Sequence, residues 1–246
     1  MKISDFEIGK RVFVIAEFGT NIFGGPSIKA TLIRFCQLAH DAGADAVKVQ
    51  LYNHQHFPES EWGEKMQTEF PRELFPEFCE MAHSYGMAAG ASVFDEEAIA
   101  LVTEHGDFLK LATREENNVR LRNACESIDF PLIRSMDWRN VEKLDSLDAI
   151  KISPNTVKLG CVPIYPTPPE AEYLPLHLPR YLARFCGWSS HSQGFVDVLC
   201  AVKNGAVVIE KHFCTHPSEN EVMWSLNPRD FAEMVWSIRV LGQERS

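Results

Sequence analysis

The 246-residue sequence has no segment that would anchor the chain in a membrane or direct it out of the cell. No window reaches the ~18–20 apolar residues that a membrane-spanning helix needs. The first residues, Met1–Asp5, carry no apolar signal stretch. These absences predict a soluble, cytoplasmic protein with no membrane partner.

Positive charge and paired cysteine motifs are also scarce. Lysine and arginine together number 24, against 34 aspartates and glutamates, so the formal net charge is −10. A chain this acidic repels nucleic acid and anionic membranes, and we expect no nucleic acid partner.

The seven cysteines are odd in number and form no C-x-x-C pair. We interpret them as small buried side chains in a reducing compartment.

The chain contains no linker, low-complexity tract or long charge run at which it would divide, so we predict a single domain over residues 1–246. Short β-rich segments alternate with amphipathic helical ones, the pattern of βα units around a parallel sheet. No G-x-G-x-x-G follows the first segment, which argues against a dinucleotide-binding fold. Eight such segments in a chain close to ~250 residues favour a (β/α)8 TIM barrel of the α/β class.

The expected elements can be given by residue. The strands are Val12–Glu17, Ala46–Leu51, Met87–Val93, Phe108–Ala112, Pro131–Ser135, Val157–Val162, Cys186–Ser189 and Ala206–His212. The helices include Ile28–Ala42, Glu73–Tyr85, Glu96–His105, Phe195–Asn204 and Pro228–Leu241.

Polar side chains gather at the ends of six expected strands. They are Glu17, Lys48 with Gln50, Lys110 with Thr113, Ser135, Ser189 with His191, and Glu210 with His212. The active site of a TIM barrel lies at these C-terminal strand ends, and isolated buried charges are costly unless they are paired or bind a ligand. Lysines beside hydroxyls suit a phosphate and a carboxylate, and two histidines near carboxylates suit a divalent metal ion. The pattern therefore predicts a barrel mouth that binds a phosphorylated acid beside a metal.

Six segments, in order along the chain, resemble the sialic acid synthase family. They are Phe13–Gly19, Ala42–Gln50, Lys110–Asn118, Ile164–Pro169, Trp188–Ser192, and Val208–Phe213 followed by Ser225–Pro228. The likeness extends from Arg11 to Leu241. By this resemblance the chain is identified as a member of that family.

The resemblance implies a transferase that condenses phosphoenolpyruvate with the open-chain aldehyde of an N-acetylated hexosamine such as N-acetylmannosamine. The products would be a nine-carbon 2-keto-3-deoxy acid of the sialic acid type and phosphate. The resemblance also implies a homodimer, because family members commonly pair.

The same analogy implies the roles of individual residues. The catalytic residues would be Glu17, Lys48, Lys110, Glu210 and His212. The substrate-binding residues would be Gln50, Thr113, Glu115, Asn117, Asn118, Ser135, Tyr165, Ser189 and Glu221. The metal ligands would be His191 and His212, holding Mn²⁺ or, in its place, Mg²⁺ or Co²⁺.

Departures from the family pattern keep a second hypothesis open. The family's N-H-N-G segment is Asn21–Gly24 here and lacks the histidine, Pro163 stands before the tyrosine of the Y-P-T segment, and Ser190 replaces the aspartate of S-D-H-T. The chain also ends at Ser246, so we expect a barrel without the antifreeze-like C-terminal domain that usually completes the sugar site in this family. The alternative is a non-catalytic barrel that binds phosphoenolpyruvate or a related anion, as the partner of a complete enzyme.

Overall fold

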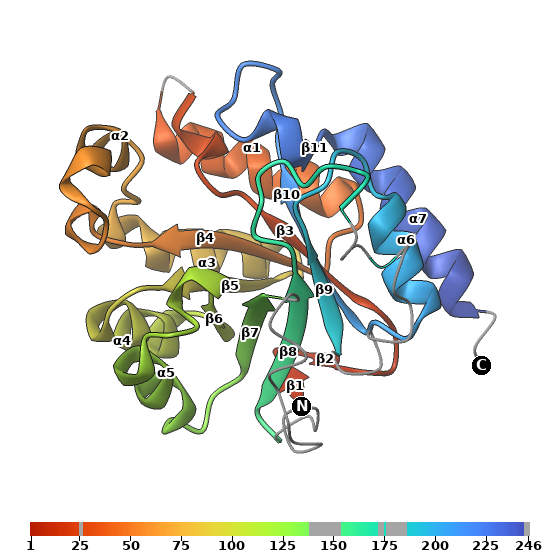
Figure 1. The fold of residues 1–246 in the computed structure, drawn as a ribbon, viewed down its shortest axis with the longest axis horizontal. Helices are drawn as coiled ribbons and strands as arrows, with labels where there is room; N and C mark the ends of the chain where they lie inside the picture. The colour runs from red at the N-terminus through yellow and green to blue at the C-terminus, as the bar shows by residue number, and fades with distance from the viewer. Residues whose placement is uncertain (25–26, 138–153, 172–174, 176–185, 244–246) are drawn as a thin grey trace.

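The computed structural model describes residues 1–24, 27–137, 154–171, 175 and 186–243. In these ranges the chain forms a closed barrel of eight parallel strands with helices packed around it (Figure 1). The expected (β/α)8 barrel is therefore confirmed. No helix in the described ranges combines the length and the apolar composition needed to cross a lipid bilayer.

The barrel strands follow one another around the ring in chain order. They are β3 (Phe13–Glu17), β4 (Ala46–Leu51), β5 (Ala88–Val93), β6 (Phe108–Leu111), β7 (Leu132–Asp137), β8 (Thr156–Cys161), β9 (Gly187–Ser190) and β10 (Val208–Phe213). β10 pairs with both β9 and β3, which closes the ring. A two-residue strand, β11 (Ser225–Leu226), lies beside the end of β10. Each expected strand agrees with the observed one to within two residues at either end.

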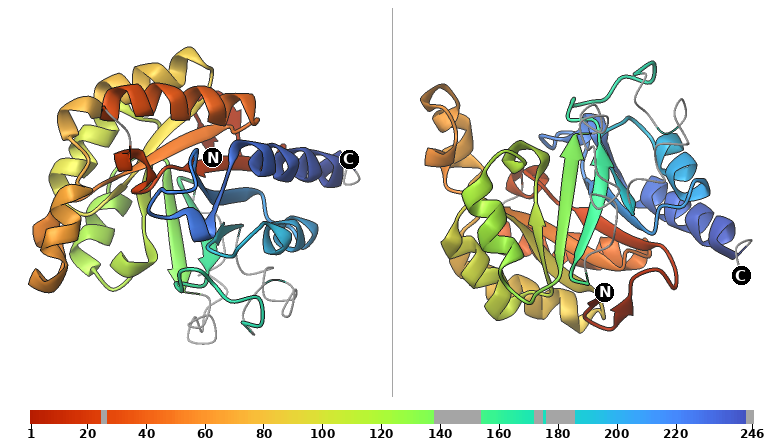
Figure 2. Two further views of the ribbon diagram at one scale, coloured as in Figure 1. Left: turned by 90° about the horizontal axis from the view of Figure 1, so that it is seen from above. Right: turned by 60° about the horizontal axis from the view of Figure 1, so that its bottom comes forward.

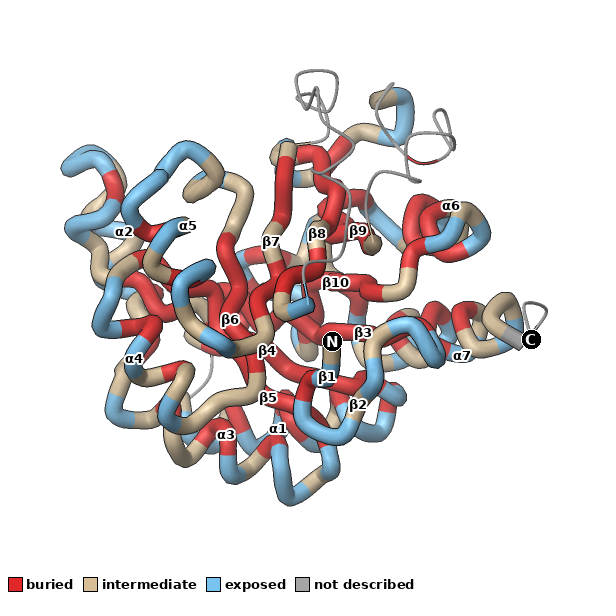
Figure 3. The backbone as a smooth tube through the Cα atoms, turned by 90° about the horizontal axis from the view of Figure 1, so that it is seen from below, coloured by how far each residue is buried: buried red, intermediate tan, exposed pale blue. Residues whose placement is uncertain are grey.

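The α-helices surround this ring, and α6 and α7 pack side by side (Figures 1 and 2). They are α1 (Ile28–Asp41), α2 (Trp62–Gln67), α3 (Phe75–Ser84), α4 (Glu96–His105), α5 (Val119–Glu126), α6 (Val196–Lys203) and α7 (Pro228–Gln243). Short 3₁₀ turns occupy the connections, namely η1 (Asn21–Gly24), η2 (His54–His56), η3 (Glu59–Glu61), η4 (Arg72–Leu74), η5 (Thr113–Glu115) and η9 (Val222–Trp224). Burial follows this layering: the strands are buried and the outer helix faces are exposed (Figure 3).

Alternation along the strands divides their side chains between two cores. Outward-facing residues such as Val14, Val47 and Ile209 pack with the helices in the larger cluster. The inward-facing residues of the N-terminal strand ends form a separate cluster inside the ring. It contains Ile3, Phe13, Ile15, Ala46, Ala88, Phe108, Ile133, Val157, Leu159 and Val208.

A short antiparallel hairpin, β1 (Lys2–Ile3) with β2 (Phe6–Glu7), adds Ile3 to the cluster inside the ring. This hairpin was not expected from the sequence. With the N-terminal end of the barrel filled by apolar side chains, the inward-facing polar residues are left at the C-terminal end.

Candidate active site

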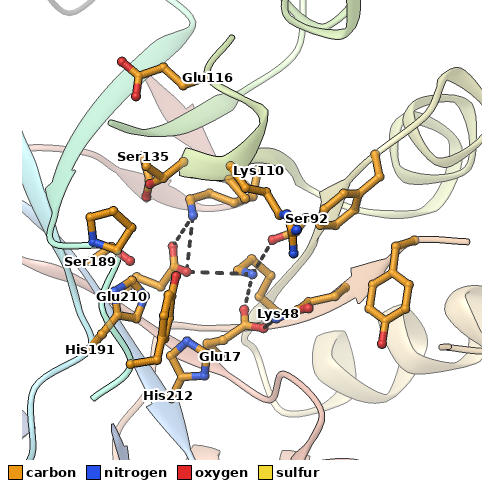
Figure 4. A pocket seen from close by; sticks show the side chains of 18 of the residues that line it. Glu17, Lys48, Ser92, Lys110, Glu116, Ser135, Ser189, His191, Glu210 and His212 are labelled. Atoms are coloured by element: carbon orange, nitrogen blue, oxygen red, sulfur yellow. Dashed lines mark hydrogen bonds and ion pairs between the residues drawn. The ribbon is translucent and has the colours of Figure 1, made fainter. Parts of the chain in front are cut away.

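A cavity of about 500 Å³ opens at the C-terminal ends of the barrel strands. On β3 the inward positions change from Phe13 and Ile15 to Glu17, and most of the other strands make the same change from apolar to polar. The strand residues that reach the cavity in this way include Glu17, Lys48, Ser92, Lys110, Ser135, Ser189, Glu210 and His212 (Figure 4). The strand period of two therefore places one polar layer directly above the apolar one.

Two lysines and two glutamates form a buried ionic network at the inner end of the cavity (Figure 4). Lys48 forms an ion pair with Glu17, and its Nζ also lies 3.8 Å from Glu210 Oε1. Lys110 Nζ lies 2.9 Å from Glu210 Oε2. Each buried charge thus has a partner of opposite sign, the condition under which such charges are tolerated.

The network keeps Glu210 ionised despite its burial. Loss of water contact alone would raise the pKa of this carboxyl group, but the ammonium groups of Lys110 and Lys48 outweigh that effect and lower the pKa to about 2. A permanently charged acceptor therefore stands between the two lysines.

Hydroxyl groups surround the lysines. Ser92 Oγ accepts a hydrogen bond of 2.7 Å from Lys48 Nζ. Thr113 Oγ1 and Cys161 Sγ share a hydrogen bond of 2.7 Å. Ser135 Oγ is fully buried and has no hydrogen-bond partner within the described part of the chain. A buried polar group without a partner is rare in proteins, so this hydroxyl has unused capacity to bind a ligand in the cavity.

Two histidines, His191 just after β9 and His212 on β10, lie next to each other in the cavity, with ring centroids 5.5 Å apart. His191 Nδ1 lies 3.1 Å from the carbonyl oxygen of Val162, and His212 Nδ1 lies 2.7 Å from Glu221 Oε2. Both partners only accept hydrogen bonds, so we assign the ring protons to Nδ1, which leaves both Nε2 lone pairs available. Burial, assisted by the neighbouring His212, lowers the pKa of His191 to about 3.

The Glu221 side chain, which contacts His212, is itself held by hydrogen bonds from the turn after β3. Glu221 Oε1 accepts a hydrogen bond of 3.2 Å from Thr20 Oγ1, and Glu221 N donates to Asn21 Oδ1 at 2.7 Å. Burial would raise the pKa of Glu221, but His212 and Thr20 lower it overall. The carboxylate is therefore fixed on both sides and holds the imidazole in one orientation.

Most of the residues expected at the site line this one cavity. They are Glu17, Lys48, Gln50, Lys110, Thr113, Asn117, Ser135, Tyr165, Ser189, His191, Glu210, His212 and Glu221. Gln50 donates to Glu17 Oε1 at 3.1 Å, and the Tyr165 ring lies 4.2 Å from the His191 ring, centroid to centroid.

Glu115 and Asn118 are not among the lining residues. Asn118 caps α5 by accepting a hydrogen bond from Leu121 N, and its amide group donates to Glu115 Oε2. Both side chains thus stabilise the start of α5, and their part in substrate binding stays a prediction.

The cavity also contains residues that were not expected from the sequence. Ser92 is the clearest of these, because β-sheet register sets it beside Gln50 on one strand and Lys110 on the other. Lys65, Arg114 and Glu116 line the cavity as well. The signal for Ser92 was present: it is the one hydroxyl on the inward face of β5, two residues beyond Gly90.

Two residues that depart from the family pattern, Pro163 and Ser190, lie on different sides of the barrel wall. Pro163 lines the cavity, whereas Ser190 lies on the outward face of β9 beside Lys211. Lys211 Nζ donates to Ser190 Oγ at 3.0 Å and to the carbonyl oxygen of Ser192 at 2.6 Å, which fixes the segment on both sides of His191. Burial lowers the pKa of Lys211 to about 8.

A TIM barrel with charged side chains and hydroxyls converging in a cavity at its C-terminal mouth has the architecture of a barrel enzyme. Sequence comparison identifies the particular group: the profile of the NeuB family matches residues 35–245. The chain belongs to the NeuB family.

Curated relatives and one solved structure agree with this assignment. The chain is 27% identical to the human N-acetylneuraminate-9-phosphate synthase over 254 residues, covering 93% of this chain and 70% of the relative. It is 29% identical to the N,N'-diacetyllegionaminic acid synthase of Legionella pneumophila over 260 residues, covering 92% of this chain and 71% of the relative. The crystal structure of an N-acetylneuraminic acid synthetase from Leptospira borgpetersenii, in complex with citrate, superposes with a TM-score of 0.87. It is 27% identical, and the match covers 100% of this chain and 90% of that one.

The expected metal site stays a prediction. In the described ranges, no group of three or more histidine, cysteine, aspartate or glutamate side chains is arranged to hold a metal ion. The chain offers two imidazole nitrogens, and further ligands would have to come from water or substrate, as in catalytic sites with open positions.

Proposed function

We propose that this protein condenses phosphoenolpyruvate with the aldehyde of an N-acetylated hexosamine, N-acetylmannosamine or a close analogue. The products are a nine-carbon 2-keto-3-deoxy acid of the sialic acid type and inorganic phosphate. The observation that carries the proposal is the inner end of the cavity, where the buried pair Lys48 and Lys110 lies beside the unpartnered hydroxyl of Ser135. Membership of the NeuB family supports the same chemistry.

Phosphoenolpyruvate binds through its phosphate and carboxylate groups. Lys48 and Lys110 supply charge, and Ser92 and Ser135 supply hydroxyl donors beside them. Glu17 and Glu210 hold the two ammonium groups in place before the ligand arrives, so little rearrangement is needed on binding. Thr113 and Ser189 complete the set of hydroxyl groups around the ligand.

The reaction forms a bond between C3 of phosphoenolpyruvate and the aldehyde carbon of the sugar, while water adds at C2 and phosphate leaves. The protein's contribution is positional. Glu210, ionised by its lysine partners, accepts a hydrogen bond from the water, and Glu17 accepts one from a sugar hydroxyl. Tyr165, whose ring is tilted by 46° against that of His191, forms part of the wall against which the sugar lies.

His191 and His212 would hold a divalent cation, because hydrogen bonding at Nδ1 leaves the other ring nitrogen of each available. Four cationic side chains and five carboxylates line the cavity, so its side chains alone do not offset the charge of an anionic substrate. Mn²⁺, or Mg²⁺ or Co²⁺ in its place, would supply positive charge and polarise the aldehyde oxygen. Glu221 contributes by fixing the ring of His212 through a hydrogen bond of 2.7 Å.

The test is phosphate release that depends on the sugar. The purified protein is incubated with phosphoenolpyruvate, Mn²⁺ and a panel of N-acetylated hexosamines, and free phosphate is measured with and without each sugar. We expect release only when an accepted sugar is present, and its loss in His212→Ala.

Phosphoenolpyruvate binding is measured separately by calorimetry. Ser135→Ala removes one hydrogen bond to a charged ligand, a loss of about 1.5–3 kcal/mol, so the dissociation constant should rise by roughly ten- to a hundredfold. Ser237→Ala, a change at a half-buried serine on α7 outside the cavity, should leave the dissociation constant unchanged. Binding without release for any sugar would support the non-catalytic barrel, and absence of binding would overturn the proposal.

A further inference from the structure

Two cations at the cavity wall share one aromatic ring. The guanidinium carbon of Arg114 lies 4.4 Å from the centroid of the Phe57 ring, and Lys65 Nζ lies 5.1 Å from the same centroid. All three residues line the cavity. Arg114 comes from η5 after β6, and Lys65 comes from α2 after β4, so two separate connections bring these charges to the Phe57 ring.

The Phe57 ring, which both cations contact, is fixed by its surroundings. Phe57 is buried against Tyr52 and Phe94, with its ring centroid 5.0 Å from that of Tyr52. The Phe57 carbonyl oxygen accepts a hydrogen bond of 2.8 Å from Trp62 Nε1, at the start of α2. Tyr52 donates to the Thr68 carbonyl oxygen at 2.6 Å, just beyond the end of α2. Lys65 is therefore carried by a helix that is anchored at both ends.

These cations are not neutralised as the inner lysines are. Arg114 has no carboxylate within 4 Å in the part of the chain that the structure describes. Lys65 pairs with its neighbour Glu64 at 3.3 Å, and the side chain of Glu64 is 75% exposed. By contrast, Lys48 and Lys110 pair with buried carboxylates. A guanidinium held by an aromatic face keeps its N–H groups available for a planar or tetrahedral anion.

We propose that Lys65 and Arg114 form an anion subsite that binds a phosphate group on the acceptor sugar, at the end remote from its aldehyde. The inference rests on the proposed function and narrows its acceptor to a phosphorylated N-acetylated hexosamine. The anionic groups of phosphoenolpyruvate are taken up by Lys48 and Lys110, which leaves this second pair of cations for the other substrate. Two cations that contact the same ring and line the same cavity match a phosphate dianion better than a single carboxylate.

The experiment measures sugar binding in the presence of saturating phosphoenolpyruvate and a metal chelator, so that the proposed metal-assisted condensation does not proceed. Calorimetry compares N-acetylmannosamine 6-phosphate with N-acetylmannosamine on the full chain. We expect the phosphorylated sugar to bind at least tenfold more tightly. The double variant Lys65→Met, Arg114→Met keeps the apolar stems over Phe57 but should abolish this preference.

Two further variants control the result. Arg114→Lys retains the charge and should recover part of the preference. Arg120→Met removes an arginine that is paired with Glu96 at 2.8 Å and lies outside this cavity, so the preference should not change. Equal affinity for the two sugars in the unmodified protein, or a preference that survives in the double variant, would overturn the subsite.

Inorganic phosphate serves as the probe for a free anion. If it binds the unmodified protein as tightly as the sugar phosphate does, and loses this binding in the double variant, the subsite serves a free anion and the acceptor assignment is wrong. The phosphate-release assay reports separately on the proposed function. If the protein prefers the sugar phosphate but releases no phosphate from phosphoenolpyruvate, the subsite is supported and the synthase function is rejected. If phosphate is released but the two sugars bind equally well, the synthase function is supported and the subsite is rejected.

Discussion

Gly19 stands where the carboxylate of Glu221 lies against the backbone. Its φ is +50°, in the left-handed region, and a Cβ atom there would overlap the Glu221 carboxylate. That carboxylate holds His212 through its Nδ1. A single hydrogen atom at position 19 therefore determines whether the imidazole can keep its orientation.

Gly19→Ala should displace Glu221 and release His212. We expect kcat/KM for the proposed condensation to fall at least tenfold, because a misplaced catalytic group loses the benefit of fixed geometry. The matched control is Gly86→Ala, at φ +72° with no atom within 4 Å of the added Cβ. Both variants should lose roughly 1 kcal/mol of unfolding free energy to backbone strain. Equal activity in the two would show that the Glu221 contact is not needed.

The start of α4 shows how a helix end is fixed beside the barrel mouth. Asp95 caps the helix by accepting a hydrogen bond of 2.7 Å from Ala98 N. Arg72 contacts both oxygens of the same carboxylate, at 3.1 and 2.5 Å. Burial would raise the pKa of Asp95, but Arg72 and the Ala98 amide lower it overall.

Asp95→Asn should therefore destabilise the protein in a pH-dependent way. The folded-state pKa lies below the unfolded value of about 3.9, so the stabilisation is fully present above that pH and is lost as the pH falls through the folded-state pKa. Asparagine can still cap the helix, so the variant isolates the charge. We expect urea unfolding to show a loss of about 1 kcal/mol at pH 7 that shrinks below pH ~4.

The control for this prediction is Glu97→Gln. Glu97 also contacts Arg72, at 2.9 Å, but its side chain is 82% exposed. Its removal should change the unfolding free energy by less than about 0.5 kcal/mol. A loss at Asp95 that is independent of pH would assign the effect to packing instead of charge.

Most strands were predictable from the sequence because they are buried on both faces and read as short apolar runs between turns. The polar strand ends were predictable for the same reason, since charges such as Lys48 and Lys110 interrupt those runs. The β1–β2 hairpin was not, because two-residue strands carry no periodicity. Ser92 was missed because a serine in an alanine- and glycine-rich strand carries no functional signal until the folded barrel brings its hydroxyl to Lys48 Nζ.

Sequence proximity was a poor guide within the segment after β6. Thr113, Arg114 and Asn117 line the cavity, whereas Glu115 and Asn118 turn toward the start of α5. In a tight turn neighbouring side chains diverge, so adjacency in a motif does not establish a shared direction. The pairing of Lys65 with Arg114 over Phe57 was out of reach for a similar reason: it depends on two connections that meet only in the folded chain.

At the scale of the whole molecule, closure of the ring brings distant parts of the chain to one point. Lys110 and Glu210 are 100 residues apart in sequence and joined by a hydrogen bond. Parallel strands all end at the same side of the barrel, so polar residues at these ends must converge. The topology therefore explains how an acidic chain assembles lysines, hydroxyls and a histidine pair in one cavity.

The central claim is that this cavity joins phosphoenolpyruvate to a sugar aldehyde by a carbon–carbon bond. The direct measurement is carbon NMR of a reaction containing [3-¹³C]phosphoenolpyruvate, a [1-¹³C]-labelled N-acetylated hexosamine or its 6-phosphate, Mn²⁺ and the protein. We predict a product whose two labelled carbons show one-bond ¹³C–¹³C coupling, absent with His212→Ala. Label that stays in phosphoenolpyruvate, or appears only in the methyl group of pyruvate, would contradict the account.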